Sequence, residues 1–249
     1  MTSVPKPHDR RRSDVLEALV ELYLRLNGYF CIPNYLQHRI EGFGLDTESD
    51  VMAIRMPYQE EVLQDGRRQP NDDTVILPED SADIDCIVAE VKEPSVEFNK
   101  SLRGPEGPLR ICAALQMFGV FPRDTFKEDG IAAKVAGDLH SAINATVWSE
   151  YPRGYSPEQK VSVRLIVFAP ATAKHAEERK HIDLQHALEF TKWRMRPGEA
   201  CSEYRSLKVP SASPWRGCTR QIVEVLDESH ATNEMNLLLE QFLDRVVAK

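Results

Sequence analysis

The chain has 249 residues, of which 42% are hydrophobic and 28% charged, as expected for a globular protein that buries a core. It contains no apolar run of about eighteen residues, so no transmembrane helix is expected. The net charge of −8 argues against a surface coated with phosphate-binding groups, because non-specific nucleic-acid binders usually carry a basic stripe or a basic domain.

The first expected elements are a helix and a short strand behind a basic tail. Residues 1–12 are polar and basic and lack the apolar segment of a secretory signal, so we expect a flexible tail. Asp14–Asn27 has a helical period, and Gly28 is suited to end the helix. Tyr29–Ile32 then predicts a strand that Pro33 stops. The residues of the apolar helical stripe are Val15, Leu19, Leu22 and Leu26.

Two longer strands follow, separated by a polar segment. Ser49–Met56 and Asp83–Lys92 are rich in β-forming residues and are followed by Pro57 and Pro94, respectively. The segment between them, Tyr58–Ser81, is rich in Asp, Pro and Gln, so an exposed excursion is expected.

The rest of the chain alternates helices and one buried strand. No Gly/Ser linker divides it, which favours one α/β domain over residues 13–249 with a helical C-terminal part. Its expected helices are Leu109–Phe118, Glu128–Trp148, Leu184–Arg194 and Glu234–Val247, and its expected strand is Val161–Phe168.

The cysteines indicate a reducing compartment. They number five, lie far apart and form no CxxC, so neither a zinc site nor a disulfide framework is expected. A cytoplasmic location is therefore predicted. The residues are Cys31, Cys86, Cys112, Cys201 and Cys218.

The last expected strand of the first hundred residues carries a charged pair. Side chains alternate along a strand, so Glu90 and Lys92 project from the same face. Such a pair in an apolar strand is costly unless something compensates both charges. Asp50, near the start of the preceding strand, adds a second carboxylate. Two carboxylates suit Mg²⁺ or Mn²⁺, which lowers the pKa of an attacking water, and a lysine can stabilise the charge on a phosphate.

These residues resemble the PD-(D/E)xK nucleases, a superfamily that includes many restriction endonucleases and the archaeal Holliday-junction resolvases. The resemblance rests on Asp50 in Glu48-Ser-Asp-Val-Met-Ala and on Glu90-Val-Lys92 in the next strand. It extends to the first helix, where the resolvases place a glutamate eleven residues ahead of a Gly-aromatic pair. Glu17 stands at that distance from Gly28-Tyr29.

The resemblance covers roughly the first hundred residues and has two departures. Ser49 replaces the proline of the motif, and the gap between Asp50 and Glu90 is longer than usual. Three segments also look similar to an uncharacterised bacterial family, which implies no substrate: Tyr23–Tyr29, Glu48–Arg55 and Ala89–Lys92.

The resemblance implies both a fold and an activity. The fold is a restriction-endonuclease-like mixed central sheet flanked by helices, with a helical C-terminal extension. The activity is metal-dependent hydrolysis of phosphodiester bonds, in DNA rather than RNA. Asp50, Glu90 and Glu17 would hold Mg²⁺ or Mn²⁺, and Lys92 would assist the attack. Cutting both strands would favour a homodimer, and no membrane partner is expected.

Simpler interpretations stay open for each residue. Glu17 fits a solvent-facing helix position equally well, Asp50 fits a turn, and Glu90 and Lys92 fit a surface ion pair on an edge strand. Asp85 is expected on the face opposite Glu90, and Asp83 in water near the loop. The alternative function is a catalytically inactive nuclease-fold module that binds nucleic acid or protein.

A late group of basic and aromatic residues has two interpretations. Such residues can grip a nucleic-acid backbone and stack on bases, but packing and solvation explain them nearly as well. The group comprises Lys192, Arg194, Arg196, Tyr204, Lys208 and Trp215.

Overall fold

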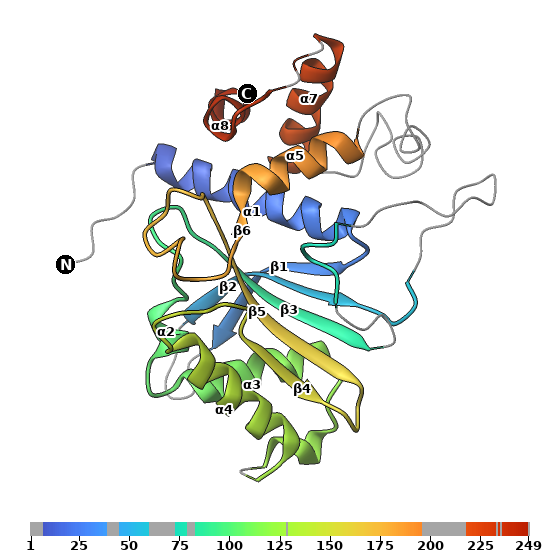
Figure 1. Ribbon diagram of the computed structural model, residues 1–249, viewed down its shortest axis with the longest axis vertical. Helices are drawn as coiled ribbons and strands as arrows, with labels where there is room; N and C mark the ends of the chain where they lie inside the picture. The colour runs from blue at the N-terminus through green and yellow to red at the C-terminus, as the bar shows by residue number, and fades with distance from the viewer. Residues whose placement is uncertain are drawn as a thin grey trace. The chain divides into compact units, whose positions relative to one another are not determined.

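Figure 1 shows the protein as a computed structural model that describes residues 7–38, 45–59, 73–78, 83–127, 129–195, 218–232, 234 and 236–248. The chain forms two compact units, each built from separate segments. The first comprises Met1–Gly28, Glu60–Ile76 and Leu184–Lys249, and the second Tyr29–Gln59 and Leu77–Asp183. We call them the helical unit and the sheet unit. The interpretation of residues 13–249 as one domain stays a prediction.

The sheet unit is built on six strands in the order β1-β2-β3-β5-β4, with β6 pairing to β5. The β1–β2 and β2–β3 pairs are antiparallel, whereas β3 and β5 run parallel. The expected α/β class with a mixed sheet is therefore confirmed. The strands are β1 (Phe30–His38), β2 (Leu45–Arg55), β3 (Ile84–Val91), β4 (Arg153–Ser156), β5 (Val161–Ala169) and β6 (Ile182–Asp183).

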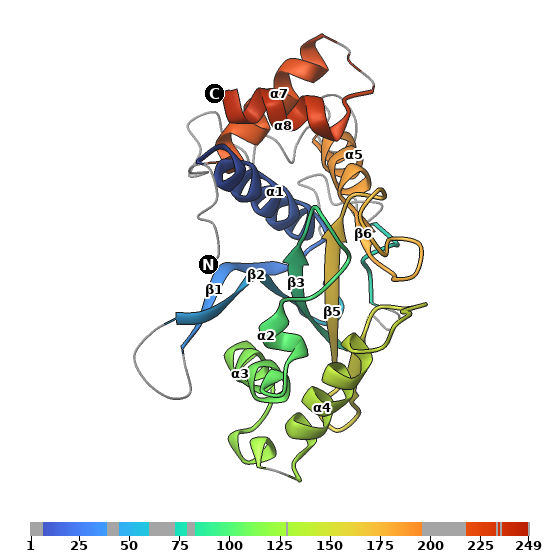
Figure 2. The same ribbon diagram turned by 90° about the vertical axis from the view of Figure 1, so that its left-hand side faces the viewer.

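The two central strands of the sheet are mostly apolar and are buried on both faces. Every residue of β5 is buried, and every residue of β3 except the first. Helices α3 (Gly107–Phe118) and α4 (Ile131–Ile143) pack on one face of the sheet, where their apolar residues join those of the strands in one core. The short helices α2 (Lys100–Arg103) and η1 (Arg123–Phe126) complete the unit. Figure 2 shows α2 between the end of β3 and α3.

The helical unit consists of four described helices, drawn blue, orange and red in Figure 1. Helix α1 contacts each of the other three. Its predicted apolar stripe is buried, with no member more than 2% exposed. Gly28 follows α1 with a φ of 82°, the left-handed conformation expected of a glycine that ends a helix. The helices are α1 (Pro7–Leu26), α5 (Leu184–Arg194), α7 (Cys218–Ala231) and α8 (Leu239–Ala248).

Two element boundaries differ from the sequence predictions because proline acts differently in different positions. Helix α1 begins at Pro7, so residues 7–12 are helical rather than part of the expected tail. Proline is tolerated in a first helical turn, where its missing N–H has no partner to lose. Strand β1 runs through Pro33, which was expected to stop it. Because β1 is an edge strand, Pro33 can sit there without breaking the ladder.

Other predicted elements differ in extent from the observed ones, and some observed elements were not predicted. Strand β2 begins at Leu45 rather than Ser49, and α4 covers only Ile131–Ile143 of the expected Glu128–Trp148. Helix α7 and the short strands β4 and β6 were not predicted. A strand as short as Ile182–Asp183 is too short to show alternation in the sequence. It forms because it pairs with β5.

Part of the expected polar excursion is anchored rather than exposed. Asp73 and Ile76 are 7% and 0% exposed. Asp73 Oδ2 lies 2.6 Å from both the Tyr23 hydroxyl, which donates to it, and His186 Nε2. Composition alone could not show that one aspartate in a polar segment has buried partners. Residues 60–72 and 79–82 lie outside the described part of the chain.

None of the described helices has the length and apolar character needed to cross a membrane. The described cysteines are all free thiols, and Cys201 lies outside the described residues.

Candidate active site

The register of β2 and β3 places the two predicted carboxylates on one face of the sheet. Met52 pairs with Val88, and both side chains belong to the core beneath α3 and α4. Asp50 and Glu90 lie two residues further along their strands, in opposite chain directions. Side chains two residues apart share a face, so Asp50 and Glu90 project from the Met52–Val88 face across neighbouring strands.

Asp50, Glu90 and Lys92 form one connected charged cluster. Asp50 Oδ2 accepts hydrogen bonds from the Val91 backbone N–H at 2.6 Å and from Lys92 Nζ at 3.3 Å. Lys92 Nζ also lies 2.7 Å from Glu90 Oε2. The side chains of Asp50 and Lys92 are 14% and 23% exposed, whereas that of Glu90 is fully buried. The cluster is therefore open at the Asp50–Lys92 side and closed at Glu90.

Burial makes the ionised form of Glu90 unfavourable. Burial raises the pKa of its carboxyl from 4.5 to about 7, against the lowering effect of Lys92, and Asp50 raises it further. The Asn99 side chain also lowers this pKa, through a contact that is not a well-directed hydrogen bond. Neither carboxylate oxygen has a hydrogen bond of good geometry within the described residues. The 2.7 Å contact with Lys92 is an ion pair without a well-directed N–H, so the lone pairs of Glu90 remain poorly used.

Lys92 remains charged at neutral pH. Burial lowers the pKa of its ammonium group, but attraction to Glu90 and Asp50 outweighs this effect and raises the pKa above its usual value. An ammonium group has three N–H donors and ligates no metal. Lys92 therefore acts as a permanent positive point charge between the two carboxylates.

The segment after β3 is held firmly beside the cluster. The Lys92 backbone N–H continues the parallel pairing by donating to the Phe168 carbonyl at 2.9 Å. Phe98 is buried with its ring centroid 5.2 Å from that of Trp148, and Arg103 Nε donates to the Phe98 carbonyl at 2.9 Å. These contacts bring Asn99 back to Glu90.

Glu17 belongs to the helical unit, where it lies on α1. Its Oε1 accepts a hydrogen bond from the Ser13 hydroxyl at 3.0 Å, and its side chain is half-buried. Among the described residues, no group of three or more His, Cys, Asp or Glu side chains is arranged to hold a metal ion. The structure thus brings together Asp50, Glu90 and Lys92, and the role of Glu17 as a ligand stays a prediction.

Asp85 faces away from this cluster, as strand alternation predicted. It is fully buried on the opposite face of the sheet, where Tyr29 donates a hydrogen bond to Oδ2 at 2.6 Å and Arg164 Nε donates to Oδ1 at 3.0 Å. The sequence analysis missed Arg164. Its signal was a lone charged residue in a mostly apolar strand, which requires a buried counter-ion.

Two expectations about other polar residues need correction or lie outside the structure. Asp83, expected in water, is only 6% exposed, and its Oδ1 lies 3.5 Å from the Tyr155 hydroxyl of β4. Arg194 of the late basic group is 1% exposed and donates to the Leu26 carbonyl, so it serves packing in the helical unit. Arg196, Tyr204, Lys208 and Trp215 lie outside the described residues.

Comparison with known proteins adds no family assignment. No family model matches the chain, and neither characterised proteins nor solved structures include a match to it. The resemblance to PD-(D/E)xK nucleases therefore depends on the ordered residues themselves. The functional argument starts from the chemistry of Asp50, Glu90 and Lys92.

Proposed function

We propose that Asp50, Glu90 and Lys92 form the active site of a divalent-metal-dependent nuclease that acts on DNA in preference to RNA. The observation that carries this proposal is Glu90, a buried carboxylate whose oxygens lack well-directed hydrogen bonds and which shares a face with a second carboxylate. Buried polar groups in proteins are nearly always satisfied, so an unsatisfied one needs an explanation. A bound cation would use the oxygens of Glu90 and would also account for Asp50.

The residues present fit Mg²⁺ or Mn²⁺. Both ions prefer oxygen ligands, and Mg²⁺ is commonly held by one or two carboxylates together with waters and substrate phosphate. The raised pKa of Glu90 shows that Lys92 alone does not compensate the ionised carboxylate. When bound, the ion would neutralise charge on the phosphate and lower the pKa of a water molecule. Asp50 and Glu90 would hold it, with Glu17 as a proposed third ligand.

The side chains of the cluster have distinct tasks in this proposal. The Val91 N–H, 2.6 Å from Asp50 Oδ2, orients the Asp50 carboxylate and leaves Oδ1 for a cation. Glu90 must be ionised to bind, so its proton leaves as the site is loaded. The Lys92 ammonium group is pinned between the two carboxylates, and one of its donors can hold the attacking water or a phosphate oxygen.

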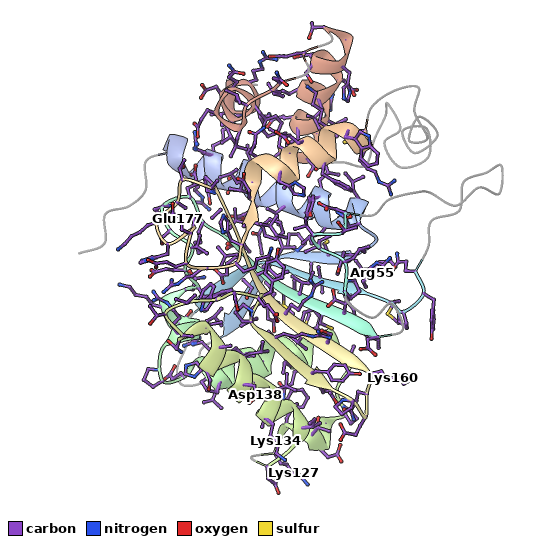
Figure 3. All side chains as sticks on the ribbon, in the orientation of Figure 1. Arg55, Lys127, Lys134, Asp138, Lys160 and Glu177 are labelled. Atoms are coloured by element: carbon purple, nitrogen blue, oxygen red, sulfur yellow. The ribbon has the colours of Figure 1, made fainter. Side chains whose placement is uncertain are left out.

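Metal affinity tests the ligand assignment. Asp50→Asn should abolish Mn²⁺ binding measured by calorimetry, because an amide oxygen lacks the charge that holds the ion. Asp138→Asn serves as the matched control, since Asp138 is an exposed carboxylate on α4 (Figure 3). Unchanged affinity in Asp50→Asn, or equal losses in both variants, would refute the ligand assignment.

Cleavage separates the enzyme from an inactive binding module. Lys92→Ala should keep Mn²⁺ affinity but lose on the order of a hundredfold in rate, as when a positioned donor to transition-state charge is removed. The substrates are single-stranded, duplex and branched DNA, in Mg²⁺ and in Mn²⁺. If the wild-type protein binds DNA and metal yet cuts none of these, the chain is a binding module.

A further inference from the structure

The sheet unit has a surface groove that follows, along the chain, the segment after β3. It has a volume of about 310 Å³ and is formed by α2, the turn after it and the first turn of α3. Its lining residues are Lys100, Ser101, Gly104, Pro105, Glu106 and Arg110. Asn99, whose side chain acts on the Glu90 carboxylate, immediately precedes Lys100. The groove therefore begins one residue from the segment that contacts the carboxylates.

The turn at the base of the groove is rigid. A Cβ atom at Gly107 would lie 2.0 Å from the Leu102 carbonyl oxygen and 2.4 Å from a His140 ring carbon, so only glycine fits there. His140 Nε2 lies 2.9 Å from the Gly104 carbonyl oxygen, which ties the turn to α4. A groove built on such a turn keeps its shape without a ligand.

The polar groups of the groove suit a phosphate. Lys100 is exposed, and its ammonium group has three N–H donors. Arg110 is largely buried and is held by Glu106, with Nη2 and Oε2 separated by 3.0 Å. Lysine, arginine, serine and backbone N–H groups supply most protein contacts to nucleic-acid phosphates. The one carboxylate, Glu106, is occupied in positioning Arg110 and reduces the positive charge of the groove.

We infer that this groove holds a second phosphate of the DNA strand, next to the phosphodiester bond cleaved at Asp50 and Glu90. This inference rests on the proposed function and sharpens its substrate class. The substrate is a continuous strand held at two phosphates, rather than an isolated phosphodiester or a mononucleotide. Lys100 provides the charge that attracts the second phosphate, and the rigid turn sets its position relative to the carboxylates.

The salt dependence of DNA binding tests the groove. Each phosphate contact contributes about −0.9 to the slope of log K against log salt concentration for duplex DNA. Lys100→Ala should make the slope shallower by about one and weaken binding by about threefold to tenfold. Binding is measured by fluorescence anisotropy with short labelled duplex and single-stranded DNA in Ca²⁺.

Two further variants make the test specific. Lys160→Ala is the matched control, because Lys160 is an exposed lysine that precedes β5, at the opposite end of β3 from Glu90 (Figure 3). It should leave the slope unchanged. Glu106→Gln keeps an acceptor for Arg110 but removes the negative charge, so it should tighten binding. A gain in affinity cannot arise from misfolding.

The outcomes distinguish the groove from the catalytic proposal. A shallower slope for Lys100→Ala alone, with tighter binding for Glu106→Gln, supports the groove even if no DNA is cut, and the nuclease proposal then fails separately. Equal slopes for wild type and Lys100→Ala overturn the groove even if DNA is cut. Equal losses for Lys100→Ala and Lys160→Ala, or no DNA binding by the wild type, overturn it as well.

Discussion

The two faces of the sheet carry two buried charged clusters that differ in how well their carboxylates are satisfied. On one face, Asp85 receives hydrogen bonds from Tyr29 and Arg164 at both oxygens. On the other face, Glu90 has an ion pair with Lys92 but no hydrogen bond of good geometry among the described residues. Both carboxylates are fully buried. Burial alone therefore does not separate a structural ion pair from a site with unused coordinating capacity, whereas hydrogen-bond satisfaction does.

The pKa directions report the same difference. Attraction to Asp85 outweighs the lowering effect of burial and raises the pKa of Arg164, so the guanidinium group stays charged at all ordinary pH values. Burial also raises the pKa of Tyr29 well above its usual value, so the tyrosine stays protonated and donates to Asp85. In contrast, the pKa of Glu90 is raised to about 7, so its carboxyl group titrates near neutral pH. The Asp85 cluster, called the locked cluster below, has its hydrogen bonds satisfied internally. The Glu90 cluster can respond to protons and cations.

The largest expected effect breaks the locked cluster. Arg164→Met should lower the free energy of unfolding by about 3–5 kcal/mol, because it leaves Asp85 charged and buried without its partner. Urea unfolding measures this change. Arg153→Met is the control, since Arg153 is a less buried arginine on the neighbouring strand that pairs with Arg164 in register. If both variants lose the same stability, Asp85 does not depend on Arg164 as described.

The second prediction concerns the pH dependence that Glu90 imposes. The native state binds the Glu90 proton more tightly than the unfolded state, because the folded pKa is about 7 instead of 4.5. Its contribution to stability is therefore fully present below pH 4.5 and is lost as the pH rises through about 7. The loss amounts to about 3 kcal/mol in the absence of a divalent ion.

Glu90→Gln isolates this contribution. The variant has no proton to lose, so its unfolding free energy should lack the decline between pH 4.5 and 7 that the wild type shows. Added Mn²⁺ should stabilise the wild type more at pH 8 than at pH 5, because the ion binds the ionised carboxylate. Both pH profiles are measured by urea unfolding without metal. Parallel profiles for the wild type and the variant would show that folding does not raise the pKa of Glu90.

Strand alternation explains how much of the site could be predicted from the sequence. It placed Glu90 and Lys92 on one face and Asp85 on the other, because the side-chain period of a strand depends only on local geometry. The satisfaction of each carboxylate could not be predicted. It depends on Arg164, which is distant in sequence from Asp85, and on the segment after β3, which has no regular pattern.

The same limit applies to the groove and to the smaller elements. Helix α2 has four residues, too few to show a helical period, so Lys100 and Ser101 had no predicted place. The close packing of Gly107 against His140 joins α3 to α4, and no local sequence pattern predicts such a contact. Local rules therefore predicted which residues share a face, and the tertiary fold determined which of them remain available to a ligand.

The smallest expected effect sharpens the comparison inside the locked cluster. The Tyr29 hydroxyl donates to Asp85 Oδ2 at 2.6 Å and accepts from Arg164 Nη2 at 3.0 Å, so it is used in both directions. Tyr29→Phe removes one bond to a charged acceptor while Arg164 continues to satisfy Asp85. The expected loss in unfolding free energy is about 1–2 kcal/mol, less than for Arg164→Met.

Tyr35→Phe provides the control for this change, because Tyr35 lies on β1, the strand that follows Tyr29, and outside the Asp85 cluster. The double variant Tyr29→Phe with Arg164→Met should lose less than the sum of the two single losses, because both residues act on the same carboxylate. Strictly additive losses would mean that Tyr29 and Arg164 stabilise the protein independently. Asp85 would then lack the shared network that distinguishes its face of the sheet from that of Glu90.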